Sequence, residues 1–329
     1  MRDLQVSFSQ TQRVRFQSAL QQLKDLSPGS GPAATVVVAD SIPVNLEDSV
    51  LKGHGTAESD GQLVATVCGV VERVNKLVYV RPFRARYKPE IGDIIVGRVI
   101  EVAPKRWRLE INFSQDAVLM LSSMNLPDGI QRRRTAVDEL NMRSIFEEDD
   151  VICAEVRGFQ HDGSLQLQAR SQKYGKLERG QLLTVPPYLV KRRKQHFHHL
   201  EDDGVDLIVG CNGYIWVGEH LETGENVMLE DQDNHMEKDG KSNLKLKGDQ
   251  DEEGTFTSVE TRRSICRIAN AIRLLSALGF TLSLEAIIDT VELSFASNIS
   301  VKDMLAAEFY VQTAEREVER RVSKLRKKA

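Results

Sequence analysis

The segment from Lys105 to Ile111 contains the residues of this sequence that are best suited to bind phosphate groups. In an extended strand successive side chains point to opposite faces, so Arg106 and Arg108 share one face and Trp107 lies on the other. We expect Lys105, Arg106 and Arg108 to contact the backbone of a nucleic acid, because their cations neutralise phosphate charge. Trp107 could stack on a base. Its face also carries Leu109 and Ile111, however, which favours a place in the core of the domain.

Two further basic runs could bind an anionic partner. Arg132, Arg133 and Arg134 are consecutive cations in a predicted loop. They could line the path of an RNA, pair with an acidic protein, or remain solvated, and the sequence does not separate these alternatives. The run Lys191–Lys194 is of the kind that binds nucleic acid or serves as a nuclear import signal.

The tetrapeptide Gly210-Cys211-Asn212-Gly213 has the GxxG form of the loop with which KH domains clamp RNA. That clamp joins two helices. Here the flanking segments, 205–209 and 214–217, are typical of strands. We therefore predict a tight hairpin turn in which Gly210, Asn212 and Gly213 are structural.

No catalytic or metal-binding constellation is visible in the sequence. The histidines His196, His198 and His199 lie close together, but no spaced cysteine or carboxylate completes a ligand set. His54, between two glycines, has no nucleophile or orienting carboxylate near it in sequence. We predict no catalytic residue, no metal and no cofactor.

The pattern of short strands and helices predicts a multidomain, mainly β protein with a C-terminal α+β part. Residues 1–33 form a helix, over about 4–26, and a linker, and residues 34–88 form a small β-domain. Residues 89–171 contain five short strands with an insertion after the third, which is typical of an OB-type barrel. Residues 172–329 form an α/β domain with a polar, disordered insertion at about 219–257.

Helix boundaries are predicted from capping residues. In the N-terminal helix we expect an apolar stripe of Val14, Ala19, Leu20 and Leu23. Its composition also fits a transit peptide, although a docking or unattached helix fits better. Capping pairs or caps are expected at the following positions: Thr135 with Asp138, Ser258, Ser283, and Ser300 with Asp303.

Composition limits the class of protein. The formal net charge of −4 does not indicate a nucleic-acid binder, so any such surface must be a local patch. The four cysteines are scattered singly, which fits a reducing compartment. No apolar run is long enough to span a bilayer, and no signal-peptide core is visible.

Several stretches together resemble one known family, the S1/KH cap subunits of the RNA exosome (ribosomal RNA-processing protein four), in a plant-like form. The stretches that carry the resemblance are Lys52–Thr56, Val71–Leu77, Gly92–Arg98, Lys105–Trp107, Leu121–Pro127, Arg132–Arg134 and Asp138–Leu140.

The resemblance implies an N-terminal β-domain at 34–88, an S1 domain at 89–171 and a KH-like domain at 172–329. It implies a non-catalytic subunit that guides single-stranded RNA into a channel for 3′–5′ processing of ribosomal RNA and for RNA decay. Its expected partners are RNase PH-like ring subunits, other cap subunits, single-stranded RNA and an RNA helicase cofactor, with no membrane. The expected locations are the nucleus, nucleolus and cytoplasm.

The sequence departs from the family in one informative way. Many RNA-binding S1 domains have an aromatic pair in the second strand, whereas this chain has Lys105-Arg106-Trp107-Arg108 there. Salt-sensitive backbone contact is therefore expected in place of base stacking. The alternatives are a free-standing S1-domain regulator or translation factor and a phosphorolytic exonuclease, for which the chain has no room.

Overall fold

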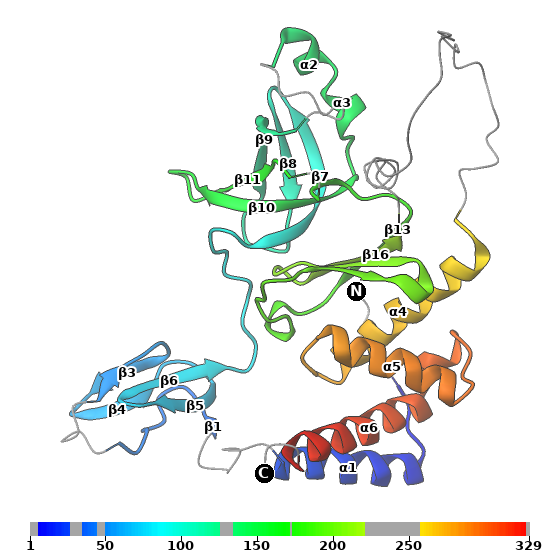
Figure 1. Ribbon diagram of the computed structural model, residues 1–329. Coiled ribbons are helices and arrows are strands. Elements are labelled where there is room, and N and C mark those ends of the chain that lie inside the picture. The colour runs from blue at the N-terminus through cyan, green and yellow to red at the C-terminus, as the bar shows by residue number, and fades with distance from the viewer. Residues whose placement is uncertain are drawn as a thin grey trace, which may run out of the picture. The chain divides into compact units, whose positions relative to one another are not determined.

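The computed structural model describes residues 6–26, 35–44, 50–125, 134–171, 173–220 and 257–326 (Figure 1). The linker predicted around 27–32 and all but the ends of the insertion predicted at 219–257 lie outside these ranges. The chain forms two compact units. The first contains residues 1–88, 185–191 and 270–329, and the second contains residues 89–184 and 192–269.

The β-domain of the first unit consists of short strands around a small apolar core. Four of its strands pair in the order β1-β5-β6-β2, and β3 and β4 form a separate hairpin. The core contains β-branched residues such as Val78 and Val80, both fully buried on β6. The strands are β1 Thr35–Val36, β2 Leu51–Lys52, β3 Thr56–Ser59, β4 Gln62–Ala65, β5 Gly69–Val74 and β6 Leu77–Pro82.

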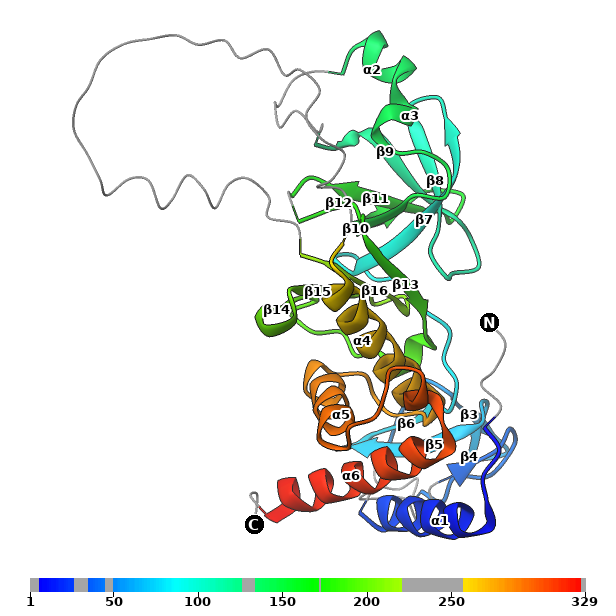
Figure 2. The same ribbon diagram turned by 90° about the vertical axis from the view of Figure 1, so that its right-hand side faces the viewer.

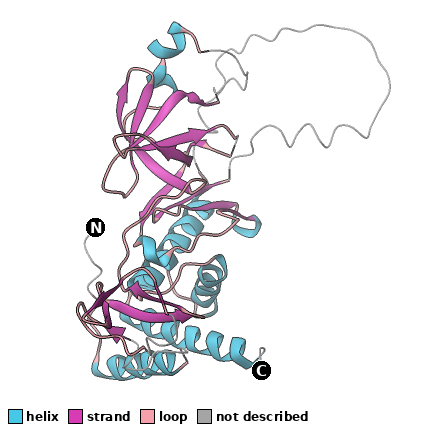
Figure 3. Cartoon of the chain, turned by 90° about the vertical axis from the view of Figure 1, so that its left-hand side faces the viewer, coloured by secondary structure: helices cyan, strands magenta, loops and turns pink. Residues whose placement is uncertain are grey.

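The second unit begins with a closed barrel of five strands, as predicted (Figure 3). Strand β7 pairs with β8 and β10, and β11 closes the barrel by pairing with both β9 and β10. A hairpin turn at Asp162-Gly163 joins β10 to β11, with Gly163 at a φ of 83°. The strands are β7 Ile94–Ala103, β8 Arg106–Glu110, β9 Ala117–Met124, β10 Val151–Phe159 and β11 Leu165–Ala169.

The insertion after the third barrel strand carries two short helices, α2 Ala136–Leu140 and α3 Met142–Ile145. The predicted capping box is present, because Asp138 Oδ2 accepts the Thr135 backbone N–H at 2.8 Å. The capping box fixes the turn that leads into α2.

A second sheet packs against the barrel within the same unit. Its order is β13-β16-β15-β14, and a short strand, β12 (Gly175–Lys176), extends the barrel sheet from β10. One apolar cluster joins Val96 and Cys153 of the barrel to Ile208, Tyr214 and Trp216 of the sheet. The strands are β13 Gly180–Thr184, β14 Phe197–Leu200, β15 Val205–Val209 and β16 Tyr214–Glu219.

Three long helices follow: α4 Val259–Ala277, α5 Leu284–Ala296 and α6 Ala307–Arg326. The caps predicted at Ser258 and Ser283 are confirmed by bonds from the Thr261 and Ala286 backbone N–H groups. The start predicted for the last helix was wrong. Ser300 and Asp303 do bond to each other, but they open only the 3-10 turn Asp303–Leu305, and the extended backbone of Ala306 separates it from α6.

The N-terminal helix α1 (Gln10–Asp25) is shorter than predicted and lies beside α6 (Figure 2). Ala19 and Leu23 are buried as expected, whereas Val14 and Leu20 are 62% and 40% exposed. The predicted stripe was therefore wrong in part. The buried face is set by α6, which contacts the side of α1 that carries Gln12 and Arg15, away from Val14.

The fold class predicted from the sequence is confirmed: a mainly β chain with an S1-type barrel and a C-terminal α+β part. Within the described ranges, no helix is both long and apolar enough to cross a membrane.

Candidate nucleic-acid interface

Strand β8 presents cations outward and apolar residues inward. Trp107 and Leu109 are fully buried, while Arg106 on the same strand is exposed. Trp107 Nε1 donates to the Phe146 carbonyl at 3.1 Å, and the two rings meet edge to face at 5.3 Å. The core interpretation of Trp107 is confirmed, and its ring is not available to stack on a base.

The outward arginines of β8 border an open hollow on the barrel. Arg106 and Arg108 come from β8, and the opposite rim comes from the loop before β9 and from the hairpin between β10 and β11. The lining residues are Arg106, Arg108, Ser114, Gln115, Asp116, Val118, Gln160, Asp162 and Ser164.

The two arginines differ in their partners. The Arg108 guanidinium is held between Glu101, at 2.8 Å, and Asp116, at 2.9 Å, which neutralises its charge. Arg106 makes no ion pair with any residue that the structure describes. Arg106 is therefore the β8 cation most available to a phosphate group.

The far rim of the hollow is acidic. The Ser164 hydroxyl and backbone N–H both donate to Asp162, and these bonds hold the pKa of the Asp162 carboxyl below its usual range, with a smaller contribution from the charge of Arg106. A ligand that enters the hollow therefore meets the Arg106 cation on one side and a carboxylate on the other. This arrangement fits a single phosphate contact better than a broad cationic track.

The other predicted cations that the structure describes contact the insertion or lie within it. Lys105 forms the turn between β7 and β8 with a φ of 64°, and its Nζ lies 3.2 Å from Glu139 of α2. Arg134 Nε donates to the Leu121 carbonyl at 3.1 Å, and its Nη2 donates to the Met124 carbonyl. These bonds anchor the insertion to β9. Arg132 and Arg133 lie outside the described residues.

The GxxG tetrapeptide forms the turn between β15 and β16 and inserts against the barrel. Asn212 is fully buried, and its Nδ2 donates to the carbonyls of Val96 at 2.7 Å and Ile111 at 2.9 Å. The Cys211 N–H donates to the Ile94 carbonyl at 2.9 Å. The turn thus bonds to the backbone of β7 and to the residue that follows β8.

Both glycines of this turn are required by geometry. Gly213 has a φ of 85°, which favours glycine. A Cβ at Gly210 would lie 2.5 Å from the Tyr214 carbonyl oxygen and 2.6 Å from Asn212 Oδ1. The backbone N–H groups of Gly210, Cys211 and Gly213 donate to protein carbonyls, so this GxxG is a packing element in the structure.

An ion pair that the sequence analysis missed joins the two parts of this unit. Arg192, which belongs to the basic run, forms a two-pronged bond with Asp93, with distances of 2.8 and 3.0 Å. The Asp93 side chain is only 5% exposed. No local pattern could have revealed the pair, because its members are 99 residues apart. Arg192 is therefore a structural cation and not a free member of a nucleic-acid-binding run.

Cysteine chemistry is disfavoured at this junction. Burial raises the pKa of the Cys211 thiol to about 12 and raises that of Cys153 further. Both thiols are therefore protonated at neutral pH, and neither is a good nucleophile.

The chain has an S1-type barrel that carries a cationic strand and packs against a KH-like sheet. These features place it in the class of S1/KH nucleic-acid-binding proteins. Family models agree with this class: "RRP4, S1 domain" matches residues 86–158, and "KH domain" matches residues 180–223.

Three curated relatives narrow the class. An Arabidopsis thaliana "Exosome complex component RRP4 homolog" is 64% identical over 327 residues, which is 99% of both chains. A Caenorhabditis elegans protein of that name is 37% identical over 74% of each chain. The Saccharomyces cerevisiae "Exosome complex component RRP4" is 36% identical over 76% of this chain and 74% of its own. The chain belongs to the RRP4 family of exosome complex components.

Proposed function

We propose that this protein is a non-catalytic cap subunit of the RNA exosome, which holds single-stranded RNA at the entrance of the complex and stabilises the ring of RNase PH-like subunits. The observation that carries the proposal is the full-length relation to an exosome component, together with Arg106 exposed at the rim of the barrel hollow. Other cap subunits and an RNA helicase are further proposed partners. The proposed locations are the nucleus, nucleolus and cytoplasm.

A binding role without catalysis is supported by the chemistry of the described residues around the hollow. The two arginines of β8 face Asp116 and Asp162, but Asp116 is paired with Arg108 and Asp162 is bonded to Ser164. A nuclease that uses metal ions needs carboxylates free to coordinate them. The arrangement fits contact with a phosphate backbone and not its cleavage.

The assembly part of the proposal is tested by the native mass of the tagged chain purified gently from its own cells. A stoichiometric complex that contains RNase PH-like subunits is expected. A chain that purifies alone, or only with ribosomes, would favour the free-standing regulator.

The RNA part is tested in the assembled complex with Arg106→Gln. We expect weaker protection of single-stranded RNA and a slope of log affinity against log salt that is smaller by about 0.7, the value for one lost phosphate contact. The matched control is Arg143→Gln, which removes an exposed cation paired with Glu148 elsewhere on the same domain. Equal slopes in the two variants would contradict a phosphate contact at Arg106.

Arg108→Gln separates the two arginines. Because Arg108 is already neutralised by Glu101 and Asp116, its loss should change RNA affinity less than the loss of Arg106. A larger effect from Arg108 would show that RNA displaces its carboxylate partners.

A further inference from the structure

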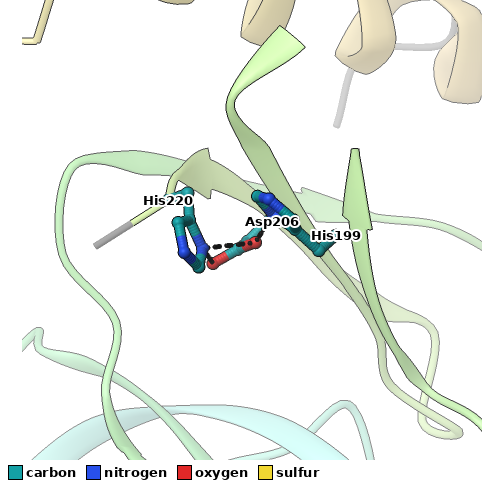
Figure 4. A group of neighbouring side chains, drawn as sticks. All are labelled: His199, Asp206 and His220. Atoms are coloured by element: carbon teal, nitrogen blue, oxygen red, sulfur yellow. Dashed lines mark hydrogen bonds and ion pairs between the residues drawn. The ribbon is translucent and has the colours of Figure 1, made fainter. Parts of the chain in front are cut away.

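Two imidazoles and a carboxylate converge at the edge of the second sheet (Figure 4). His199 lies on β14 directly opposite Asp206 on β15. His220 follows the end of β16, and its backbone N–H donates to the Gly204 carbonyl at 3.0 Å. The three side chains therefore come from three adjacent segments whose backbones are fixed by hydrogen bonds.

The side chains meet through the atoms that bind metals. His199 Nδ1 lies 2.7 Å from Asp206 Oδ1, and His220 Nδ1 lies 2.9 Å from Asp206 Oδ2. The two rings are in contact, with centroids 4.0 Å apart. One ligand atom from each residue lies within 4.8 Å of the other two.

We propose that His199, Asp206 and His220 form a binding site for a divalent transition metal of the Zn²⁺ type. Neutral imidazole nitrogen and carboxylate oxygen are ordinary ligands of Zn²⁺, and three protein ligands leave the fourth tetrahedral position to water. Imidazole disfavours Mg²⁺ and Ca²⁺, which prefer oxygen ligands.

The geometry requires only a small adjustment. With metal–ligand bonds of about 2.0–2.1 Å, tetrahedral ligands lie roughly 3.3 Å apart. The present nitrogen–oxygen distances of 2.7–3.0 Å would have to open by a few tenths of an ångström. The side chains are 35–39% exposed, so they have room to make this change.

A bound metal would connect an edge strand to the rest of the sheet. In the described sheet β14 is the outermost strand and pairs with β15 alone. A metal held by His199, Asp206 and His220 would tie β14 to β15 and to the end of β16. The site is thus expected to be structural, and it is independent of the proposed RNA contact.

The test is calorimetric titration of ZnCl2 into the full chain after treatment with a chelator. The variants are His220→Gln and Asp206→Asn, and the matched control is His198→Gln, which removes the neighbouring histidine of the same strand. Because other parts of the chain can also bind Zn²⁺, the informative quantity is the difference between variants. We expect the two site variants to lose one equivalent of Zn²⁺, or to bind it at least tenfold more weakly, while the control matches the parent.

A second readout uses Co²⁺ in place of Zn²⁺. The parent and His198→Gln should give the intense visible absorption of four-coordinate Co²⁺, and His220→Gln should lose it. Melting temperatures in chelator establish that the variants are folded, and His220→Gln keeps the test valid if Asp206→Asn does not fold. Identical titrations and spectra in parent, site variants and control would overturn the proposal and leave a hydrogen-bonded trio only.

Discussion

At the scale of single residues, Asn212 determines how the KH-like sheet is joined to the S1 barrel. Its amide is fully buried and bonds to the carbonyls of Val96 and Ile111. The backbone carbonyl of Asn212 accepts a hydrogen bond from Asn112 Nδ2 at 2.9 Å. A side chain with neither donor nor acceptor would leave two barrel carbonyls buried and unbonded, which costs more than the bonds themselves contribute.

Asn212→Ala is therefore expected to lower the free energy of unfolding by about 2–6 kcal/mol, from two unsatisfied carbonyls at about 1–3 kcal/mol each. Chemical denaturation of the full chain measures the loss. Asn141→Ala is the matched control, because Asn141 is exposed and its side chain makes no cap hydrogen bond. Equal losses in the two variants would show that the buried amide is not important.

The pair of Arg192 and Asp93 allows a similar comparison within one basic run. Arg192→Gln leaves the Asp93 carboxylate, which is 5% exposed, without its two-pronged partner. We expect a loss of about 1.5–3 kcal/mol, the value for hydrogen bonds to charged groups. Arg193→Gln, at the adjacent exposed position, should change stability by no more than about 0.5 kcal/mol. A reversed order would indicate that the run is held by Arg193.

At the scale of elements, α1 is held on α6 by side chains that are mostly polar. Arg15 bridges Glu308 and Glu315, each at 2.7 Å, and Gln12 donates to Glu308 at 2.9 Å. Phe8 stacks on Phe16 and meets Tyr310 edge to face. Since the ion pairs are about 40% exposed, each contributes only modestly.

The docking of α1 should depend on pH. The bonds from Gln12 and then Arg15 hold the pKa of the Glu308 carboxyl below its usual range. A carboxyl whose pKa is depressed in the folded state stabilises that state at pH values above the pKa of the unfolded chain, about 4.3. This contribution is lost as the pH falls through the pKa of the folded state. Amide hydrogen exchange should therefore show α1 opening more readily below about pH 4.

Arg15→Gln tests the same contact at neutral pH. We expect faster exchange in α1 that corresponds to about 0.2–1 kcal/mol per lost ion pair. The further change on acidification should be smaller than in the parent but not absent, because the Gln12 bond to Glu308 remains. Arg13→Gln, an exposed cation on the same helix, is the control. Unchanged exchange in Arg15→Gln would show that the aromatic contacts alone hold the helix.

The elements also show which parts of the structure can be predicted from the sequence. The burial of Trp107 and the turn at Gly210–Gly213 follow from local alternation and from flanking strands. The neutralisation of Arg108 does not, because Glu101 lies on the neighbouring strand β7 and Asp116 in the loop before β9, and the strand register that brings them to Arg108 is not visible in the sequence. Strand β14 was not predicted, because Phe197-His198-His199-Leu200 contains no β-branched residue.

The metal-binding trio illustrates the same limit. In the sequence, no cysteine or carboxylate at a suitable spacing completes a ligand set for His196, His198 and His199. In the structure His199 meets Asp206 and His220, which follow it by 7 and 21 positions in the sequence. The pairing of the strands brings them together. His196 is not part of this trio, and its Nδ1 lies 2.7 Å from the Val209 carbonyl oxygen.

At the scale of the whole molecule, the net charge of −4 repels the phosphate backbone of RNA, whereas the local cations attract it. We therefore expect the isolated chain to bind single-stranded RNA weakly and without sequence preference. Fluorescence anisotropy with two oligonucleotides of different sequence, over a range of salt, measures this. The expected slope corresponds to few phosphate contacts, at about 0.7 per contact. Tight binding of one sequence that resists salt would favour base recognition and contradict the assignment of Arg106.

The pairing of α1 with α6 has a consequence for how the chain is made. Arg15 and its partner Glu308 are 293 residues apart. A ribosome that adds roughly 5–20 residues per second needs about 15–60 seconds to cover this interval. Throughout that time α1 lacks the helix that it packs against, and side chains that are buried in the folded chain, such as Ala19 and Leu23, stay open to chaperones. The docking of α1 must therefore wait until α6 has left the ribosome.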